Sequence, residues 1–288
     1  MGILIDKDTR VLVQGITGRV GSVQTRWMLY YGTKVVAGVT PGKGGQEVCG
    51  LPVYDRVREA VEREGANASV IFVPAPFAKE AALEAMEAGL KLVVVITEHV
   101  PLHDSFQLRR RAQQSGCILV GPNCPGLLRP GVGKLGIMPG NLFTPGPVGL
   151  VGRSATLSYE VAGQLTLAGW GQSTAVGVGG DATTGLRLSE VLPLFEADPE
   201  TRAVVMVGEI GGTAEEEAAA VIEEMSKPVI AFIAGRTAPA GRKLGHAGAM
   251  VRGSQGTAQS KIDALRSAGA LVADSPAAIP GLVQRRLG

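Results

Sequence analysis

The chain has 288 residues, of which 45% are hydrophobic and 19% are charged, an ordinary balance for globular domains. Its formal net charge of only +2 argues against a nucleic-acid-binding protein, which has to neutralise many phosphates. Three cysteines without C-x-x-C spacing, the lack of a signal-peptide pattern and apolar runs too short to span a bilayer predict a cytoplasmic protein with no membrane contact.

The first half of the chain alternates short β-branched runs with helical patterns. Helices are predicted at residues 77–89 and 105–116. The predicted strands are almost continuously apolar, as strands buried on both faces are, and cover residues 10–14, 34–40, 68–74, 91–97 and 117–123. This alternation of strand and helix predicts a parallel, doubly wound α/β sheet of the Rossmann type.

A Pro- and Gly-rich passage at residues 138–149 interrupts this pattern and predicts a linker. The helix predicted at residues 213–225 begins with a candidate capping box, Thr213 to Glu216. The second set of strands is predicted at residues 148–152, 173–179, 203–210, 229–235 and 270–273. The chain is long enough for two domains of about 150 residues each. We therefore expect a Rossmann-like domain at residues 1–143 and a flavodoxin-like parallel-sheet domain at residues 144–288.

The first predicted strand leads into a helix through a glycine-rich turn. Gly15, Gly18 and Gly21 stand three residues apart there. Glycines let the backbone approach a ligand closely, and a helix N-terminus offers free amides and a partial positive charge to a phosphate. The spacing matches the dinucleotide fingerprint only loosely, and the alternative is a tight strand-to-helix turn that binds nothing.

The end of the second predicted strand distinguishes between possible ligands. NAD sites have an Asp or Glu about 20 residues after the glycines, which binds the ribose hydroxyls. Here the strand ends in GVTPGKGG, with no acid and with Lys43 at the tip. A lysine suits a phosphorylated ribose, so this stretch predicts coenzyme A or NADP as the ligand rather than NAD. It lacks the spacing of a Walker loop, and no ATP site is predicted there.

Ligands of open α/β sheets bind at the carboxyl ends of the strands. The fourth predicted strand ends in ITE, so Ile96, Thr97 and Glu98 are candidates to line the ligand crevice. A solvated loop acid is the alternative for Glu98.

Two further candidates lie at strand ends in the second half. The stretch VGRSATLSYE runs from a strand into a helix and places Ser154, Ala155 and Thr156 at the helix start, where free amides bind phosphate. Glu209 ends an apolar strand, and we expect it to be partly buried.

His246 stands in an unusual stretch of the sequence. Residues 235–256 hold six glycines, and a structureless segment of that length inside a compact domain is usually functional. Residues 225–262 contain no Asp or Glu but six basic residues, namely Lys227, Arg236, Arg242, Lys243, Arg252 and Lys261. This composition predicts an electropositive loop that receives an anion.

Together these candidates predict a covalent phosphoryl site. The unperturbed pKa of histidine is about 6.5, so a neutral imidazole is available as a nucleophile near neutral pH. Its attack on a phosphoryl group gives phosphohistidine, and a nearby carboxylate would orient the ring and fix its tautomer. A structural histidine with satisfied hydrogen bonds is the alternative for His246.

Seven motifs follow one another along the chain: QGITGRVG, GVTPGKGG, VPAPF, ITE, GPNCPG, GEIGG and GHAGA. In this order they resemble the α subunits of succinyl-CoA synthetases (succinate–CoA ligases), and the resemblance extends from ILIDKDTRV nearly to the end of the chain.

The resemblance implies functions for individual residues. It implies that His246 is the phosphorylated residue, that Glu209 is its orienting acid and that Tyr159 lies at the organic acid. It also implies an N-terminal domain whose contacts to coenzyme A come from Thr17, Gly18, Arg19, Val20, Lys43, Ile96, Thr97 and Glu98.

The resemblance further implies a citric acid cycle reaction that interconverts succinyl-CoA, phosphate and a nucleoside diphosphate with succinate, CoA and a nucleoside triphosphate. Nucleotide and Mg²⁺ are expected on a separate ATP-grasp β subunit, and no metal is expected on this chain. Two alternatives stay open: a related acid–CoA ligase acting on another dicarboxylate such as malate, and a CoA- or NADP-binding regulatory protein without covalent chemistry.

Overall fold

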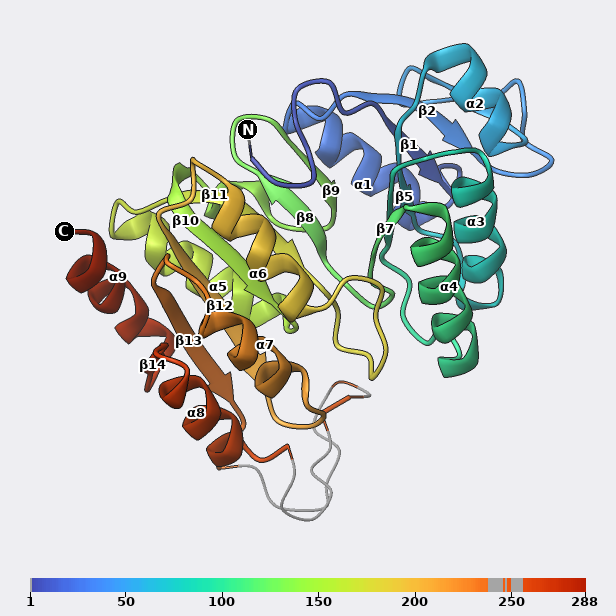
Figure 1. Ribbon diagram of the computed structural model, residues 1–288. Helices are drawn as coiled ribbons and strands as arrows, with labels where there is room; N and C mark the ends of the chain where they lie inside the picture. Colours follow the sequence, from blue (N-terminus) through green and yellow to red (C-terminus); the bar gives the residue numbers. More distant parts are fainter. Residues whose placement is uncertain (1, 238–245, 247, 250–255) are drawn as a thin grey trace. The chain divides into compact units, whose positions relative to one another are not determined.

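The computed structural model describes residues 2–237, 246, 248–249 and 256–288. Within them the chain divides into two compact units, each a mainly parallel sheet with helices on both faces (Figure 1). The predicted α/β fold class is therefore confirmed.

We call the two parts the N-terminal unit, which comprises Leu4–Met138 and Thr183–Gly185, and the C-terminal unit, which comprises Met1–Ile3, Pro139–Ala182 and Leu186–Gly288. The longest segments of the two units join between Met138 and Pro139, inside the predicted linker. The last residues of that linker already belong to a strand, which begins at Pro145.

The N-terminal unit alternates strands and helices as predicted. Its strands are β1 (Val11–Gln14), β2 (Val35–Val39), β3 (Glu47–Val48), β4 (Leu51–Tyr54), β5 (Ala68–Ile71), β6 (Leu92–Val95), β7 (Ile118–Val120), β8 (Gly126–Arg129) and β9 (Gly133–Gly136). Its helices are α1 (Arg19–Tyr30), α2 (Val57–Glu64), α3 (Ala75–Glu87) and α4 (Leu102–Ser115).

The main sheet of this unit has the strand order β3-β4-β2-β1-β5-β6-β7. Its neighbouring strands are parallel, except for the antiparallel hairpin of β3 and β4. The parallel strands, taken in chain order, lie 3-2-1-4-5-6, which is the order of Rossmann folds. The order reverses between β1 and β5, and such folds bind ligands at the carboxyl edge beside that reversal.

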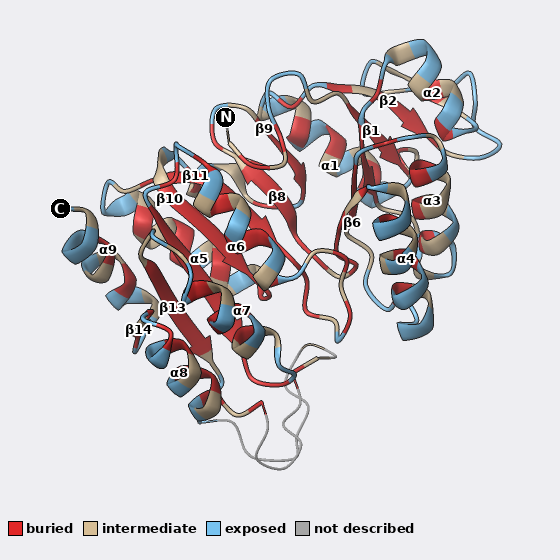
Figure 2. Ribbon diagram, viewed as in Figure 1, coloured by how far each residue is buried: buried red, intermediate tan, exposed pale blue. Residues whose placement is uncertain are grey.

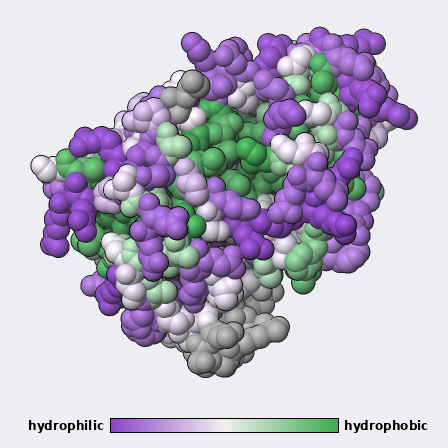
Figure 3. All heavy atoms as spheres, viewed as in Figure 1, coloured by the Kyte–Doolittle hydropathy of each residue, from purple (hydrophilic) through white to green (hydrophobic). Residues whose placement is uncertain are grey.

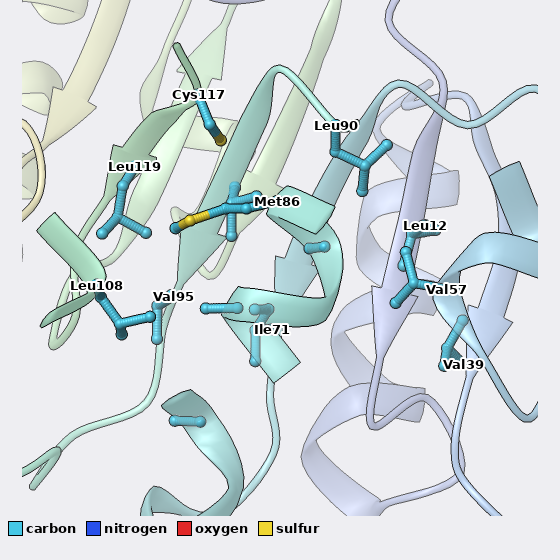
Figure 4. Close-up of a cluster of buried hydrophobic side chains, with 14 of the residues drawn as sticks. Leu12, Val39, Val57, Ile71, Met86, Leu90, Val95, Leu108, Cys117 and Leu119 are labelled. Atoms are coloured by element: carbon cyan, nitrogen blue, oxygen red, sulfur yellow. The ribbon is translucent and has the colours of Figure 1, made fainter. Parts of the chain in front are cut away.

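A hydrophobic core lies between this sheet and helices α2, α3 and α4. Leu12, Ile71 and Val95 extend from the strands, and Met86 of α3 and Leu108 of α4 meet them (Figure 4). Helix α1 packs on the opposite face of the sheet. The outward faces of α3 and α4 are largely hydrophilic (Figure 3), as expected for helices that bury one face, although Phe77 of α3 and Leu102 and Phe106 of α4 are exposed.

The C-terminal unit continues the alternation. Its strands are β10 (Pro145–Gly152), β11 (Gln172–Gly177), β12 (Ala203–Glu209), β13 (Val229–Ala234) and β14 (Leu271–Ala273). Its helices are α5 (Ala155–Leu167), α6 (Leu188–Ala197), α7 (Ala214–Ile222), α8 (Ala258–Ser267) and α9 (Ile279–Leu287), with short 3₁₀ turns η1 (Gly140–Leu142) and η2 (Pro276–Ala278).

The strands of this unit lie parallel in the order β14-β13-β12-β10-β11. In chain order this arrangement is 2-1-3-4-5, the order of flavodoxin-like folds, with the reversal between β10 and β12. Helices α5 and α9 pack on one face, and α6, α7 and α8 pack on the other. The strands are consequently buried on both sides (Figure 2), which explains their continuous apolar runs.

The sequence patterns do not reveal the hairpins β3–β4 and β8–β9. These strands have at most four residues. Glycine and proline occur within or beside them, and a search for apolar runs treats those residues as loop.

The predicted capping box at the start of α7 is wrong. Thr213 is the N-cap residue, but its side chain accepts no backbone hydrogen bond, and its hydroxyl donates instead to Glu217. Glu216 points to Lys261, whose Nζ atom lies 2.9 Å away. An unpaired buried ammonium group costs more free energy than an uncapped helix end that faces water, so the carboxylate of Glu216 pairs with Lys261.

We expect Phe195→Ala to lower the free energy of unfolding by about 3–5 kcal/mol, because a large core side chain is lost and a cavity remains. The ring is fully buried and packs on the backbone of Gly149, where a Cβ atom would lie 2.5 Å from it. Urea unfolding provides the measurement. Leu167→Ala is the control, since Leu167 is 87% exposed and its truncation should change stability by no more than about 0.5 kcal/mol. Equal effects of the two substitutions would contradict this packing.

Candidate functional site

The strand-order reversal of the C-terminal unit brings two charged side chains together. Arg153 directly follows β10, and Glu209 is the last residue of β12. Arg153 is 5% exposed and Glu209 is 8% exposed, so the predicted burial of Glu209 is confirmed. Arg153 Nη2 lies 3.5 Å from Glu209 Oε1.

His246 comes to this edge from a distant part of the sequence. Its Nδ1 atom lies 2.9 Å from both carboxylate oxygens of Glu209. The ring packs on the backbone of Gly180, where a Cβ atom would lie 2.3 Å from Cγ of His246. The N–H of Gly248 donates to the carbonyl of Gly180 at 3.1 Å. The histidine and the glutamate singled out in the sequence are thus in direct contact.

The contact with Glu209 determines the state of the imidazole ring. An ionised carboxylate only accepts hydrogen bonds, so the ring donates through Nδ1–H and a neutral ring carries its lone pair on Nε2. This hydrogen bond raises the pKa of His246, and the negative charge of Asp181 acts in the same direction. Burial and the charge of Arg153 lower the pKa. The side chain is 30% exposed, so solutes can reach it.

Buried ion pairs and a backbone hydrogen bond fix the position of Glu209. Glu215 accepts a hydrogen bond from the backbone N–H of Glu209 at 3.1 Å and lies 3.3 Å from Nη1 of Arg153. Lys261 is fully buried, and its ammonium group pairs with the carboxylate of Glu215. The sequence analysis missed Arg153, Glu215 and Lys261 as parts of one cluster. Arg153 follows an apolar strand, and a charged residue at such a strand end could have been picked as a candidate. No local sequence pattern, however, shows that Arg153, Glu215 and Lys261 meet in the fold.

The helix after β10 begins at the same edge. Its N-cap residue Ser154 accepts a hydrogen bond from the N–H of Leu157 at 3.5 Å, and the helix starts at Ala155 as predicted. The first turn contains no acid, so the partial positive charge of the helix end is not offset there. Thr156 is exposed, and Tyr159 follows in the next turn.

The predicted electropositive surroundings of His246 are wrong for those basic residues that the structure describes. Lys227 donates to the carbonyl of Phe195 at 2.8 Å, Arg236 lies 2.8 Å from Asp274, and Lys261 is buried with acids. Each long side chain is engaged by local acceptors. Arg242, Lys243 and Arg252, like most of the glycine-rich run 235–256, lie outside the described residues.

The N-terminal unit carries the second candidate site, at the turn between β1 and α1. Gly15 has φ +80°, and a Cβ atom at Gly21 would lie 2.1 Å from the carbonyl oxygen of Gly15. Only glycines permit this close crossing of the turn and the helix. Gly18 is the N-cap residue and provides no side-chain cap, and Arg19 and Val20, both exposed, open the helix. The helix start is therefore open to an anion.

The loop after β2 lies beside this turn. The hydroxyl of Thr17 donates to that of Thr40 at 3.2 Å, and Thr40 accepts a backbone hydrogen bond from Lys43 at 3.1 Å. Asp55 also accepts from the N–H of Lys43 at 3.0 Å, which fixes the loop backbone. The side chain of Lys43 is exposed. The structure thus joins two predicted ligand segments.

The third segment follows β6 at the same carboxyl edge. The hydroxyl of Thr97 donates to the carbonyl of Val73 at 2.6 Å, and Ile96 is half-buried. Glu98 is exposed and lies 3.8 Å from His99. Thr97 is held by the backbone, whereas Glu98 stands in solvent.

Two further properties bear on the type of site. Among the described residues, no group of three or more His, Cys, Asp or Glu side chains has the arrangement of a metal site. The helices in the described part of the chain are too short or too polar to cross a membrane.

Two protein families match separate parts of the chain. The family described as "CoA binding domain" covers residues 6–99. The family described as "CoA-ligase" covers residues 151–271, which include Glu209 and His246.

Several relatives match over nearly the whole chain. A succinate–CoA ligase (ADP-forming) subunit alpha of Methanothermobacter thermautotrophicus is 60% identical over 99% of this chain and 97% of its own length. Subunit alpha 2 of the same ligase in Archaeoglobus fulgidus is 58% identical, covering 98% of this chain and 99% of its own. The corresponding subunit of Aquifex aeolicus is 55% identical, covering 100% and 95%.

Two solved structures share the fold. An ATP citrate lyase of Methanosaeta concilii, in complex with (3S)-citryl-CoA, superposes with a TM-score of 0.88 at 27% identity over 98% of this chain and 50% of that chain. A dinucleotide-forming acetyl-coenzyme A synthetase of Ca. Korarchaeum cryptofilum superposes with a TM-score of 0.75 at 26% identity over 93% and 58%. This chain thus spans only about half the length of these two solved chains.

We expect His246 to titrate above the ordinary 6.5, because Glu209 stabilises its protonated form. NMR of the imidazole protons against pH measures this, with His246→Asn assigning the resonance among the three histidines. Glu209→Gln should lower the pKa, since an amide offers no negative charge. Because the folded pKa is raised, protonated His246 stabilises the fold below the unfolded pKa, and this contribution disappears as the pH rises through the folded pKa. An unchanged pKa in Glu209→Gln would refute the contact.

We also expect Gly180→Ala to displace the imidazole from Glu209, because the new methyl group would occupy the position of the ring. The pKa of His246 should then fall below that of the parent protein in the same NMR titration. Gly281→Ala is the matched control, since a Cβ atom at Gly281 meets nothing within 4 Å. A Gly180→Ala protein that titrates like the control would show that the ring does not pack there.

Proposed function

Because the chain belongs to the family of succinate–CoA ligase α subunits, we propose that it is the subunit that carries the phosphoryl group of this ligase on His246. The observation that supports this most directly is the 2.9 Å contact of Nδ1 with the buried carboxylate of Glu209. It leaves Nε2 of a partly exposed ring as the nucleophile.

The proposed reaction has three steps. Phosphate attacks the thioester carbonyl of succinyl-CoA, the C–S bond breaks, and succinyl phosphate and CoA form. Nε2 of His246 then attacks the phosphorus of succinyl phosphate, the P–O bond breaks, and succinate leaves with the electron pair. A nucleoside diphosphate finally takes the phosphoryl group from the histidine and becomes the triphosphate. Each step is reversible.

Glu209 supports the second step through its contact with Nδ1. As Nε2 forms its bond to phosphorus, positive charge develops on the ring, and the adjacent carboxylate stabilises it. The amides at the start of α5, in Ser154, Ala155 and Thr156, bind phosphate oxygens in this proposal. Tyr159 lies at the organic acid, as the family resemblance implies.

Coenzyme A binds to the N-terminal unit in this proposal, which assigns residues 1–143 as the CoA-binding domain and 144–288 as the ligase domain. The open helix start at Thr17–Val20 receives the pyrophosphate, and Lys43 receives the phosphorylated ribose. Ile96, Thr97 and Glu98 line the crevice beside them. The matching CoA-binding family covers all of these segments.

The relatives are named as α subunits, so a partner subunit belongs to the assembly. We assign the nucleotide and Mg²⁺ to a β subunit of the ATP-grasp type. We expect the complex in the cytoplasm, since the odd count of three cysteines without C-x-x-C spacing does not suit a disulfide framework. A ligase acting on another dicarboxylate, such as malate, would use the same His246 chemistry and remains the second candidate. A regulatory protein that only binds coenzyme A is not favoured, because it has no need of a buried acid against His246.

We expect brief treatment of the complex with ATP and Mg²⁺ to add one phosphate to His246. Mass spectrometry of the intact chain and its peptides measures this, and the adduct should be labile in acid and stable in alkali. His246→Asn should accept no phosphate and lose ligase turnover while keeping its CoA affinity. Turnover in His246→Asn, or an unmodified His246 in a complex that binds nucleotide, would refute the covalent mechanism.

We expect Lys43→Met to weaken CoA binding by about tenfold or more, as for the loss of a hydrogen bond to a charged group. Its affinity for dephospho-CoA should stay at the parent value, because that ligand lacks the ribose phosphate. Isothermal titration gives both affinities. Lys91→Met is the matched control, an exposed lysine that directly precedes β6 at the opposite edge of the sheet. Tight binding of NADP without binding of CoA would contradict the assigned ligand.

A further inference from the structure

A buried cluster of charges extends from Glu209 into the C-terminal unit. Arg153 contacts both Glu209, at 3.5 Å, and Glu215, at 3.3 Å. Lys261 pairs with Glu215 and lies 2.9 Å from Glu216. Four elements far apart in the sequence therefore meet: the end of β10, the end of β12, the first turn of α7 and helix α8.

The same side chains hold the backbone around Glu209. Glu215 accepts the backbone N–H of Glu209 at 3.1 Å. Arg153 donates to the carbonyl of Gly211 at 3.1 Å, and Lys261 donates to that of Gly212 at 3.0 Å. The Glu209 side chain and the loop that follows it are therefore held by one connected set of hydrogen bonds.

The cluster also reaches the histidine segment. A Cβ atom at Gly248 would lie only 2.6 Å from Nη2 of Arg153, so the guanidinium group lies against the backbone two residues after His246. Arg153 thus touches the carboxylate that orients the ring and the segment that carries the ring.

Stability alone explains this arrangement poorly. Glu215 and Lys261 are 0% exposed, and burying ionised groups costs so much desolvation energy that apolar replacements are often as stable or more stable. The two cations, Arg153 and Lys261, balance only two of the three acids Glu209, Glu215 and Glu216. One negative charge remains in the cluster, and His246 is in contact with it through Glu209.

We propose that Arg153, supported by Glu215 and Lys261, is a positioning residue that holds the Glu209 carboxylate in the orientation that selects the Nδ1–H tautomer of His246. This inference rests on the proposed function, since tautomer selection matters because Nε2 is the nucleophile. In this proposal Arg153 acts on the ring through Glu209.

The first variant is Arg153→Met, which removes the guanidinium group and keeps an apolar stem. Without Arg153 the carboxylate can rotate, so both imidazole tautomers should become populated in ¹⁵N NMR of the full chain. The initial rate of His246 phosphorylation in the complex should fall by about 10²-fold, as for a small misplacement of a catalytic group.

The second variant guards against a folding defect. Arg153→Met leaves Glu215 with less positive charge around it, so Arg153→Met/Glu215→Gln removes one charge of each sign and leaves Lys261 paired with Glu216. Its far-UV circular dichroism should match the parent chain, and it should still show mixed tautomers and slow phosphorylation. Arg187→Met/Glu217→Gln is the matched control, since it removes an exposed pair 3.0 Å apart that contributes at most about 1 kcal/mol.

The outcomes separate the two proposals. A folded double variant with a single Nδ1–H tautomer and the parent rate overturns the positioning role. If both Arg153 variants fail to fold while the control folds, the cluster is a stability element and the proposal is also overturned. If the parent complex itself does not phosphorylate His246, the proposed function fails, and the tautomer measurement still decides whether Arg153 positions Glu209.

Discussion

The buried carboxylate of Glu209 is the constraint on which the site depends. An ionised carboxylate that is 8% exposed is tolerated only with charged or hydrogen-bonding partners around it. His246 supplies one partner and Arg153 another. Arg153 is itself buried and requires Glu215, and Glu215 in turn requires Lys261. Each buried charge is thus paired with the next one, and these pairings fix the local structure of the site.

Both units place their candidate site at the same kind of position. In each sheet the strand order reverses once among the parallel strands, between β1 and β5 and between β10 and β12. Loops on the two sides of a reversal leave in opposite directions, which opens a crevice at the carboxyl edge. In the N-terminal unit a glycine-rich turn and exposed side chains lie at this edge. In the C-terminal unit the buried side chains of Arg153 and Glu209 lie there. The first arrangement suits reversible binding of an anion, and the second suits a covalent step that needs a fixed nucleophile.

The shared backbone does not determine which acid is activated. The ATP citrate lyase and the acetyl-coenzyme A synthetase superpose with TM-scores of 0.88 and 0.75 although their names give different acids. Specificity in such folds therefore resides in side chains at the site rather than in the strand order. The strong identity to succinate–CoA ligase α subunits, 60% in one case, is a more specific guide than the fold.

The sequence by itself predicted the two α/β units and the strands with continuous apolar runs, and it singled out His246 and Glu209 as candidate site residues. These features are local, because buried parallel strands need continuous apolar residues and because a histidine among glycines and an acid at a strand end are visible in a linear string. The short hairpins β3–β4 and β8–β9 were not visible, since pairing with a neighbouring strand stabilises them rather than their own composition.

Only the tertiary structure determined which partner each charged side chain has. The acid-free stretch around His246 predicted free cations, yet Lys261 is buried between Glu215 and Glu216, and Arg236 pairs with Asp274. Thr213 and Glu216 have the spacing of a capping box, yet Glu216 binds the buried lysine instead. The partner of an ionised side chain is chosen by desolvation and by which groups the fold brings within about 4 Å. Neither quantity is contained in the order of residues along the chain.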